Sequence, residues 1–440
     1  MYDLIVIGAG PAGLGAAEVA GADGRVAVVD MNVRPGGQYW RHSAADASRG
    51  RGRIGRRQRM LSGVDYYPRH RVWNIERGDR FRVHTLSGQR DPESVVLEGR
   101  AVLLATGAYD RTLPFPGGDL PGVMTAGGVQ SLWKGDGVIP RGRIVLAGTG
   151  PFLLPVATGI AGGGGDVVGV WEANRLGRDA VVLAGNLAKA GEAVGYAARM
   201  ARRRVPYRTG ATVVAAHGRD RLESVTVAQV TANWRVVPGT RRRIGCDVLA
   251  VGYGFMPQLE LAESLGCRLV PGVDGWPVVA VSATQRTSVP GVYAAGESTG
   301  VGGAVLAEYE GRLAGHAVVG SRPSARLLAA RGNAQRFADR LARAFPVRDG
   351  WRGWATDDTV VCRCEEVDHA AITRAVAAGG VDPRTAKLLS RAGMGWCQGR
   401  VCGYALTCLT NDDRSALPVS RSIGQPVGLG ILAGEGEKGD

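Results

Sequence analysis

Lysine and aromatic residues are scarce in this chain of 440 residues. Only four of its 54 basic residues are Lys, and aromatic residues make up 6% of the sequence. The formal net charge is +14, but the near-exclusive use of Arg together with 68 Gly indicates genome composition more than selection for nucleic acid. The Arg-rich stretch 49–59 lacks the interleaved aromatic residues that stack on bases, so it predicts a solvated loop. No nucleic-acid partner is expected, and an acidic protein partner stays open.

The sequence also lacks a signal peptide, a clear membrane span and evenly paired cysteines. Its first apolar run begins almost at Met1, with no basic segment before it. Residues 144–165 are 22 uncharged residues, but their seven Gly and two Pro follow a strand, turn and helix pattern. Seven Cys is an odd number, and four of them form one C-terminal pattern, which favours a metal site over disulfides. We expect a cytoplasmic protein without an integral membrane span; peripheral contact with the inner face of the membrane stays open.

A pattern typical of nucleotide binding opens the chain. Residues 4–7 predict a short buried strand, and residues 14–22 predict a helix. Between them lies the run Gly8-Ala9-Gly10-Pro11-Ala12-Gly13. In this pattern the first glycine permits a tight turn, the second lets the backbone approach a pyrophosphate, and the third allows helix and strand to pack closely. Free N–H groups at the helix start then hold the phosphate charge.

An acid after the next strand completes this unit. Residues 26–29 predict a second buried strand, and Asp30 follows 17 residues after Gly13. This is near the spacing of about 20 expected for the acid that binds ribose hydroxyls. A glycine-rich turn in an ordinary βαβ unit is the simpler alternative. Strand, glycines, helix and acid together favour a dinucleotide site.

The same pattern returns in the middle of the chain. Residues 143–147 predict a strand, Gly148 and Gly150 follow it, and the next predicted strand ends at Glu172. The third glycine position holds Leu153, so we expect looser packing of helix on strand here. An acid at this place favours the ribose of NAD over NADP, because it repels a 2′-phosphate. Whether this second unit binds a nucleotide or is kept for packing stays open.

Three further segments carry glycine or an acid at a turn. Residues 34–38 form either a plain Pro-Gly turn or one that lies over the phosphate or ring of a cofactor. A predicted strand at 101–105 ends in a Thr-Gly pair. A strand within 289–297 ends in Gly-Glu before a predicted helix at 302–315, where an acid and helix N–H groups would meet a flavin's ribityl chain and pyrophosphate. The residues concerned are Gly37, Gln38, Thr106, Gly107, Gly296 and Glu297.

Four cysteines near the C-terminus predict a metal centre. They form a CxC pair and a Cx4C pair, separated by 32 residues. Four thiolates hold either one [2Fe–2S] cluster or a structural zinc ion, and buried free thiols are the third alternative. Tight zinc loops use Cx2–4C pairs, so the CxC pair favours the cluster. The predicted ligands are Cys362, Cys364, Cys397 and Cys402, whereas Cys408 is expected in a core.

The first glycine unit, the Thr-Gly pair, the second glycine unit and the Gly-Glu strand end follow one another along the chain. In this order the sequence resembles the pyridine nucleotide–disulfide oxidoreductase superfamily over about residues 1–320. The resemblance implies FAD on the first unit and a nucleotide on the second, although Glu297 stands where that family usually has Asp. No CxxC lies near the flavin segments, since 20 residues separate Cys246 from Cys267, so disulfide reduction is not expected. The residues that the resemblance assigns to FAD are Gly8, Gly10, Pro11, Ala12, Gly13, Asp30, Gly37, Gln38, Thr106, Gly107, Gly296 and Glu297, and those that it assigns to the second nucleotide are Gly148, Gly150 and Glu172.

The cysteine pattern resembles the bacterioferritin-associated ferredoxin-like [2Fe–2S] domain, with a more widely spaced second pair. A flavoprotein followed by this module resembles the FAD-binding subunits of hydrogen cyanide synthase, opine oxidase and D-hydroxyproline dehydrogenase. The resemblance implies an amine-oxidase-like flavoprotein partner that oxidises an amino acid, while the subunit resembling this chain passes the electrons on. A small ferredoxin-like subunit is a further candidate partner. Two cofactor questions stay open: NAD or another adenine nucleotide in the second unit, and FMN at a subunit interface.

The expected fold is α/β, with two Rossmann-like dinucleotide-binding domains, the second inserted in the first, and a small, mostly helical iron–sulfur domain. The expected bounds are 1–115 and 275–325 for the FAD domain, 116–274 for the second nucleotide-type domain, 326–355 for a linker, 356–412 for the [2Fe–2S] domain and 413–440 for a tail.

Electron transfer is therefore the expected function, and no general acid or base is assigned because none of the six His lies in a motif. The first alternative is a self-contained NAD(P)H oxidoreductase that uses Gly148, Gly150 and Glu172. The second is a structural or regulatory flavin-binding subunit whose cofactors do not turn over.

Overall fold

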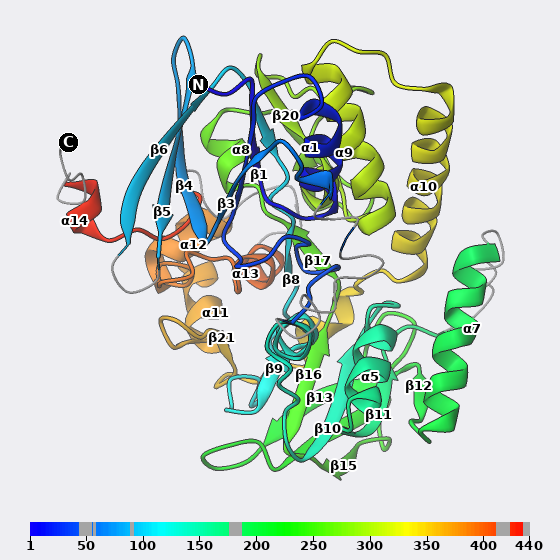
Figure 1. The fold of residues 1–440 in the computed structure, drawn as a ribbon. Coiled ribbons are helices and arrows are strands. Elements are labelled where there is room, and N and C mark those ends of the chain that lie inside the picture. The colour runs from blue at the N-terminus through cyan, green and yellow to red at the C-terminus, as the bar shows by residue number, and fades with distance from the viewer. Residues whose placement is uncertain (44–54, 56–58, 89–91, 176–186, 411–422, 434–440) are drawn as a thin grey trace. The chain divides into compact units, whose positions relative to one another are not determined.

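The computed structural model (Figure 1) describes all residues except 44–54, 56–58, 89–91, 176–186, 411–422 and 434–440. The chain divides into two compact units, which are described separately. Unit 1 is formed by Met1–Ala108, Pro257–Asp339 and Ser420–Asp440, and unit 2 by Tyr109–Met256 and Arg340–Val419. Most of the predicted loop at 49–59 and of the predicted tail at 413–440 lies outside the described residues.

Unit 1 is built on a parallel sheet of five short strands in the order β20-β7-β1-β2-β3. The innermost strands are fully buried, as expected for a parallel sheet that is covered on both faces. Helix α1 (Pro11–Ala20) starts three residues earlier than predicted, because Pro at the first helical position needs no N–H partner. The strands are β1 (Leu4–Ile7), β2 (Val26–Asp30), β3 (Asp65–Pro68), β7 (Val102–Leu104) and β20 (Val292–Ala294).

Helix α9 (Ala304–Val318) packs against α1 at very short range (Figure 1). A Cβ on Gly311 would lie 1.8 Å from the carbonyl oxygen of Ala12, and one on Gly15 would lie 2.6 Å from that of Glu308. Glycine at these two positions lets the helix backbones approach within a distance that any side chain would prevent. This contact fixes the end of β20 relative to the first glycine loop.

A three-stranded antiparallel sheet forms a β meander in unit 1. Its strands are β4 (His70–Arg77), β5 (Phe81–Ser87) and β6 (Glu93–Gly99), paired in that order. The remaining short elements of unit 1 are α8 (Glu260–Ser264), β18 (Leu269–Pro271), β19 (Pro277–Val279) and α14 (Leu429–Leu432). Strands β8 (Ala108–Asp110) and β17 (Phe255–Pro257) lie at two of the four places where the chain passes from one unit to the other.

Unit 2 repeats the parallel arrangement in the order β12-β11-β10-β16-β9. An antiparallel sheet, β13-β14-β15, follows in the chain, and its last strand leads into buried β16. The elements are β9 (Val123–Thr125), α4 (Ala126–Ser131), β10 (Arg143–Gly148), α5 (Leu153–Gly162), β11 (Asp166–Glu172), α7 (Leu187–Arg202), β12 (Tyr207–Thr209), β13 (Ala211–His217), β14 (Ser224–Gln229), β15 (Arg242–Gly245) and β16 (Val248–Gly252).

The second glycine loop differs from the first in where its helix begins. Helix α1 starts three residues after Gly8, whereas α5 starts at Leu153, five residues after Gly148. The longer turn makes room for the Leu153 side chain, which is buried at 1% exposure. The extra side chain at the third glycine position is thus accommodated by a later helix start.

Helix α10 (Ala325–Ala344) is followed by a segment in which Trp351 and Trp354 are buried. The cysteine-rich segment then folds as a short hairpin and three helices, and Cys408 is buried in the last of them, as predicted. No helix within the described ranges combines the length and apolarity needed to cross a bilayer. The elements are β21 (Val360–Cys362), β22 (Val367–Asp368), α11 (His369–Ala377), α12 (Pro383–Ser390) and α13 (Gly403–Thr410).

The α1–α9 contact predicts opposite effects of alanine at two helical glycines. Gly311→Ala forces a Cβ into the Ala12 carbonyl and should destabilise the protein by about 2–3 kcal/mol. Gly332→Ala in α10 is the matched control, because the nearest atom to its Cβ is the end of the Arg336 side chain, at 3.6 Å. This control should gain about 0.5–1 kcal/mol from helix propensity. Denaturation midpoints measure both, and a Gly311→Ala midpoint at or above that of the wild type would refute the close contact.

Candidate functional site

The first glycine loop joins β1 to α1. Gly8 has a φ of +105°, and a Cβ there would lie 2.3 Å from the Ala105 carbonyl oxygen. A Cβ on Gly13 would lie 1.8 Å from the Gly8 carbonyl oxygen, so neither position tolerates a side chain. Gly10 is the N-cap of α1, and no side chain caps this helix start. The first N–H groups of α1 therefore suit an external anion such as a phosphate.

Asp30 holds this loop from the end of β2. Its Oδ2 accepts a hydrogen bond from the Ala9 N–H at 2.6 Å, and its Oδ1 accepts from the backbone and side chain of Asn32 at 2.6 and 2.8 Å. Burial raises the pKa of this carboxyl, against the opposing effect of these N–H donors. A carboxylate oxygen accepts about two hydrogen bonds, so Oδ2 keeps capacity for a ribose hydroxyl. The ribose role of Asp30 stays a prediction.

The turn at 34–38 lies directly against the glycine loop. The Gly36 N–H donates to the Ala9 carbonyl oxygen at 2.7 Å. Gly37 has a φ of +57°, and a Cβ there would lie 2.9 Å from the Gly10 Cα. Gly37 thus lies against the glycine loop, and Gln38 follows it in the chain; the cofactor role of both stays a prediction.

Thr106 and Gly107 follow the carboxyl end of β7, which neighbours β1 in the sheet. The Thr106 hydroxyl donates to the Gln258 carbonyl oxygen at 3.0 Å, and the Gln258 N–H donates to the Gly107 carbonyl oxygen at 3.0 Å. These two bonds join the residues after β7 to Gln258, which lies at the start of the second chain segment of unit 1. Gly107 has a φ of +83°, with no atom within 4 Å of a Cβ built on it.

Glu297 lies in the short 3-10 helix Gly296–Thr299 after β20. Its Oε1 accepts from the Gly303 N–H at 2.9 Å, at the start of α9. Its Oε2 is buried and has no hydrogen-bond partner among the described residues. Burial raises the pKa of this carboxyl to about 7, and the nearby Glu310 carboxyl adds to the rise. A buried oxygen without a partner fits a ligand that brings a hydroxyl, as the ribityl chain of FAD would.

Glu310 is a site residue that the sequence analysis missed. It is 1% exposed on α9 and accepts hydrogen bonds from the Gly296 N–H and the Thr299 hydroxyl, both at 3.0 Å. Arg331 of α10 donates to its other oxygen at 2.9 Å. The signal was present in the sequence, because the residues three and four positions before Glu310 are apolar. An acid at that spacing stands in the buried stripe of the helix.

The second glycine loop is held by the same device. The Gly150 N–H donates to Glu172 Oε2 at 2.7 Å, and the Asn174 N–H donates to Oε1 at 2.9 Å. A Cβ on Gly148 would lie 1.8 Å from the Gly252 carbonyl oxygen. Glu172 is completely buried, and burial raises its pKa to about 7.

Asn174 ties this second loop to distant parts of unit 2, which sequence reasoning also missed. Its side-chain amide donates to the Thr149 hydroxyl at 2.6 Å and to the Pro346 carbonyl oxygen at 3.0 Å, and it accepts from Trp234 Nε1 at 3.1 Å. Trp354 Nε1 donates to the Trp234 carbonyl oxygen at 3.0 Å, and the two indoles stack with centroids 6.0 Å apart. The segment after α10 is therefore fastened to the second loop. One signal in the sequence was the Asn two residues after the acid, which occurs in both units.

The four predicted ligand cysteines interact with one another within unit 2. Cys402 interacts with both Cys362 and Cys397, and Cys364 interacts with the same two thiols. The Gly393 N–H also points at Cys362 Sγ, at 3.4 Å. The hydrogen bond from Cys402 lowers the pKa of Cys362, while the same interaction raises the pKa of Cys402. Cys362 and Cys402 are buried, whereas Cys364 is exposed.

A single-ion centre is not formed by these thiols. Over the part of the chain that the structure describes, no three or more Cys, His, Asp or Glu side chains gather around one point as metal ligands. Basic residues adjoin them: Arg400 donates to the Tyr109 hydroxyl at 2.9 Å, and Arg363 donates to the Asp119 carbonyl oxygen.

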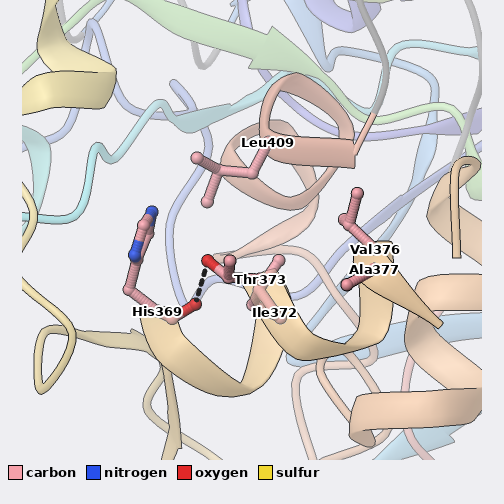
Figure 2. A pocket seen from close by; sticks show the side chains of 6 residues that line it. All are labelled: His369, Ile372, Thr373, Val376, Ala377 and Leu409. Atoms are coloured by element: carbon pink, nitrogen blue, oxygen red, sulfur yellow. Dashed lines mark hydrogen bonds between the residues drawn. The ribbon is translucent and has the colours of Figure 1, made fainter.

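A small pocket of about 280 Å³ is lined by residues of α11 and α13 (Figure 2). Its lining is largely apolar, and its Thr373 hydroxyl is used within α11, donating to the His369 carbonyl oxygen at 3.0 Å. No predicted cofactor or metal residue lines this pocket. The lining residues are His369, Ile372, Thr373, Val376, Ala377 and Leu409.

A family model described as pyridine nucleotide-disulphide oxidoreductase matches residues 2–318. The chain belongs to this family. As a member it is an FAD-dependent oxidoreductase, which confirms the predicted resemblance and the use of FAD. The α/β fold with parallel sheets is confirmed as well.

Similar proteins extend over nearly the whole chain. The A subunit of opine oxidase from Agrobacterium tumefaciens is 34% identical over 98% of this chain and 91% of that one. The HcnB subunit of hydrogen cyanide synthase from Pseudomonas protegens is 31% identical over 91% of this chain and 90% of that one. The crystal structure of L-proline dehydrogenase from P. horikoshii shares the fold, with a TM-score of 0.66 at 20% identity over 98% of this chain and 79% of that chain.

The buried carboxyl of Glu297 predicts a pH-dependent stability of the flavin-free protein. Its pKa is about 7 in the folded protein, against an ordinary value of 4.5. Folding thus favours the protonated form, so the contribution to stability is complete below pH 4.5 and is lost as the pH rises through 7. We expect the wild type to lose at most about 3 kcal/mol of unfolding free energy through this group between pH 5 and 8. Glu297→Gln should not show this loss.

Urea unfolding at several pH values measures the difference between the two proteins. Glu98→Gln is the control, because Glu98 is an exposed partner of Arg80 in the same unit. Its curve should run parallel to that of the wild type. A Glu297→Gln curve that also runs parallel would show that Glu297 does not carry this pH dependence.

Proposed function

We propose that the chain is the FAD- and [2Fe–2S]-containing electron-transfer subunit of a heteromeric amino-acid dehydrogenase or oxidase, with an imino acid, opine or glycine type of substrate. The observation that carries this proposal is similarity over nearly the full length to chains named as subunits of opine oxidase and hydrogen cyanide synthase. Oxidation of the amino acid then belongs to an amine-oxidase-like flavoprotein partner. A small ferredoxin-like subunit is a further proposed partner.

In this proposal FAD is held by unit 1. The N–H groups at the start of α1 and Gly10 bind its pyrophosphate, Asp30 binds the adenosine ribose, and the free oxygen of Glu297 accepts a ribityl hydroxyl. When bound, FAD supplies transfer of two electrons together or one at a time. The chain itself provides the glycine loop, where no side chain blocks the approach of the cofactor. It also provides the buried carboxylates of Asp30 and Glu297, and Thr106, whose hydroxyl bonds to the Gln258 carbonyl oxygen.

The cysteine spacing supports a [2Fe–2S] cluster over zinc. Tight zinc loops use Cx2–4C pairs, whereas this chain has a CxC pair and a Cx4C pair. The Gly393 N–H donates to Cys362 Sγ, and hydrogen bonds to ligand sulfurs affect the reduction potential of an iron–sulfur cluster. A domain at 356–412 that holds the cluster is therefore proposed, and the cluster would supply single-electron transfer.

A self-contained NAD(P)H oxidoreductase is the second candidate. Glu172 favours it, since an acid stands at the end of β11 as NAD binding requires. The surroundings of that acid weigh against it: Leu153 takes the third glycine position, and Asn174 binds Thr149, Trp234 and Pro346. We propose that hydride from NAD(P)H does not enter through this loop. An adenine nucleotide bound to this loop and an FMN at a subunit interface are further proposed cofactors.

The first test uses the purified chain under anaerobic conditions. NADH or NADPH should leave the flavin absorbance unchanged in a preparation that dithionite reduces, and the amino-acid-oxidising partner together with its substrate should reduce it. Rapid bleaching by NADH alone would overturn the proposed route. If the partner and its substrate leave both cofactors oxidised, the chain has a structural or regulatory role instead.

The second test concerns the metal ligands. Cys362→Ser should lose both iron and acid-labile sulfide, because Ser leaves one iron of the cluster with a single thiolate. Cys267→Ser is the matched control: Cys267 is also buried, and its thiol donates to the Thr287 hydroxyl at 3.6 Å, a contact that Ser can make. The control should keep full iron and sulfide. Zinc without sulfide in the wild type, or a full cluster in Cys362→Ser, would refute the ligand assignment.

A further inference from the structure

Glu310 reaches from α9 to both ends of the short helix that carries Glu297. Its Oε2 accepts from the Gly296 N–H and from the Thr299 hydroxyl, each at 3.0 Å. Gly296 and Thr299 are the first and last residues of that helix. One carboxylate oxygen thus ties both ends of the four-residue turn, with Glu297 held between them.

The turn has little freedom left once these bonds are made. Gly296 has a φ of +80°, which other residues adopt at a cost, and a Cβ there would lie 3.0 Å from the Ala12 Cβ. Glu297 is in addition fixed by the Gly303 N–H at the start of α9. Both anchors of this turn therefore come from α9 or its N-cap, and α9 is itself locked to α1 by the contact of Gly311 with Ala12.

Glu310 also forms a largely buried ion pair with Arg331. Glu310 is 1% exposed, and an unpaired carboxylate at such a place would be costly. Arg331 of α10 pairs with its Oε1 at 2.9 Å, with only 2% of the Glu310 side chain exposed. Burial raises the pKa of Glu310, and the Arg331 charge together with the hydrogen bonds from Gly296 and Thr299 opposes this by favouring the ionised form.

We propose that Glu310, paired with Arg331, is a positioning residue of the flavin site, which sets the place of the unpaired Glu297 oxygen and the electrostatic potential at the bound flavin. This inference rests on the proposed seating of FAD at Glu297. It goes beyond that seating, because neither Glu310 nor Arg331 belongs to the glycine loops or to the strand-end motifs.

Glu310→Gln tests the proposal on the full chain. The amide removes one negative charge and presents a donor to Arg331, so the turn loosens and the surroundings of the flavin become more positive. We expect FAD to bind about tenfold more weakly, equivalent to about 1.4 kcal/mol. The midpoint potential of the flavin that remains bound should shift to a more positive value, because reduction adds negative charge.

Glu308→Gln is the matched control on the same helix. Glu308 also pairs with an arginine, Arg312 at 3.2 Å, whereas the bonds to both ends of the turn at Glu297 come from Glu310. Loss of the Glu308 charge should leave the FAD dissociation constant and the midpoint potential within experimental error of the wild type. Thr299→Val provides a second variant without a change of charge. It removes the hydroxyl that the Glu310 carboxylate shares with the Gly296 carbonyl oxygen, at 3.0 and 2.8 Å, so it should weaken FAD binding with a smaller potential shift.

The outcomes separate the inference from the proposed function. A wild-type chain that binds no FAD would refute the seating itself. Wild-type affinity and potential in Glu310→Gln would refute the positioning role alone. A lower melting temperature with an unchanged potential would assign Glu310 to stability only, which also refutes the role. If Glu310→Gln does not fold, Thr299→Val decides, and unchanged FAD affinity in that variant overturns the proposal.

Discussion

A hydrogen bond from a glycine loop to a buried carboxylate organises both nucleotide-type units. The Ala9 N–H donates to Asp30 at 2.6 Å, and the Gly150 N–H donates to Glu172 at 2.7 Å. Each acid also accepts from the residue two positions later in the chain. In a site of low dielectric constant these donors offset the cost of burying a carboxylate, and in return they fix the loop, the strand end and the helix start relative to one another. The other contacts of each site are built on that fixed loop.

The same device leads to different sites in the two units. In unit 1 the loop faces a turn whose Glu297 keeps one buried oxygen without a partner among the described residues, so a ligand can complete its hydrogen bonds. In unit 2, Asn174, two residues after the acid, is already bonded to Thr149, Trp234 and Pro346. A duplicated pattern in the sequence therefore does not predict duplicated surroundings, because segments far away in the chain supply the donors and acceptors around each loop.

Buried acids form a second theme of unit 1. Glu297 and Glu310 lie near each other, and the charge of Arg331 and the N–H groups of Gly296 and Gly303 compensate them. Each carboxylate has a raised pKa because of burial, and the mutual repulsion adds to that of Glu297. Under the proposed seating of FAD, acids at this place affect the potential of the flavin as well as its position, because reduction adds negative charge to it.

The sequence by itself determined the features that depend on local sterics and spacing. Gly8 and Gly13 stand where a Cβ would meet the backbone, Asp30 closes the unit at the expected distance, and the apolar runs became the buried strands of the parallel sheets. The family followed from these motifs. Only the tertiary structure decided what lies between segments far apart in the chain: Arg331 on Glu310, and Pro346 on Asn174, 172 positions away. Such contacts depend on how helices and linkers pack after the strands are formed, and a motif that covers a few consecutive residues carries no record of that packing.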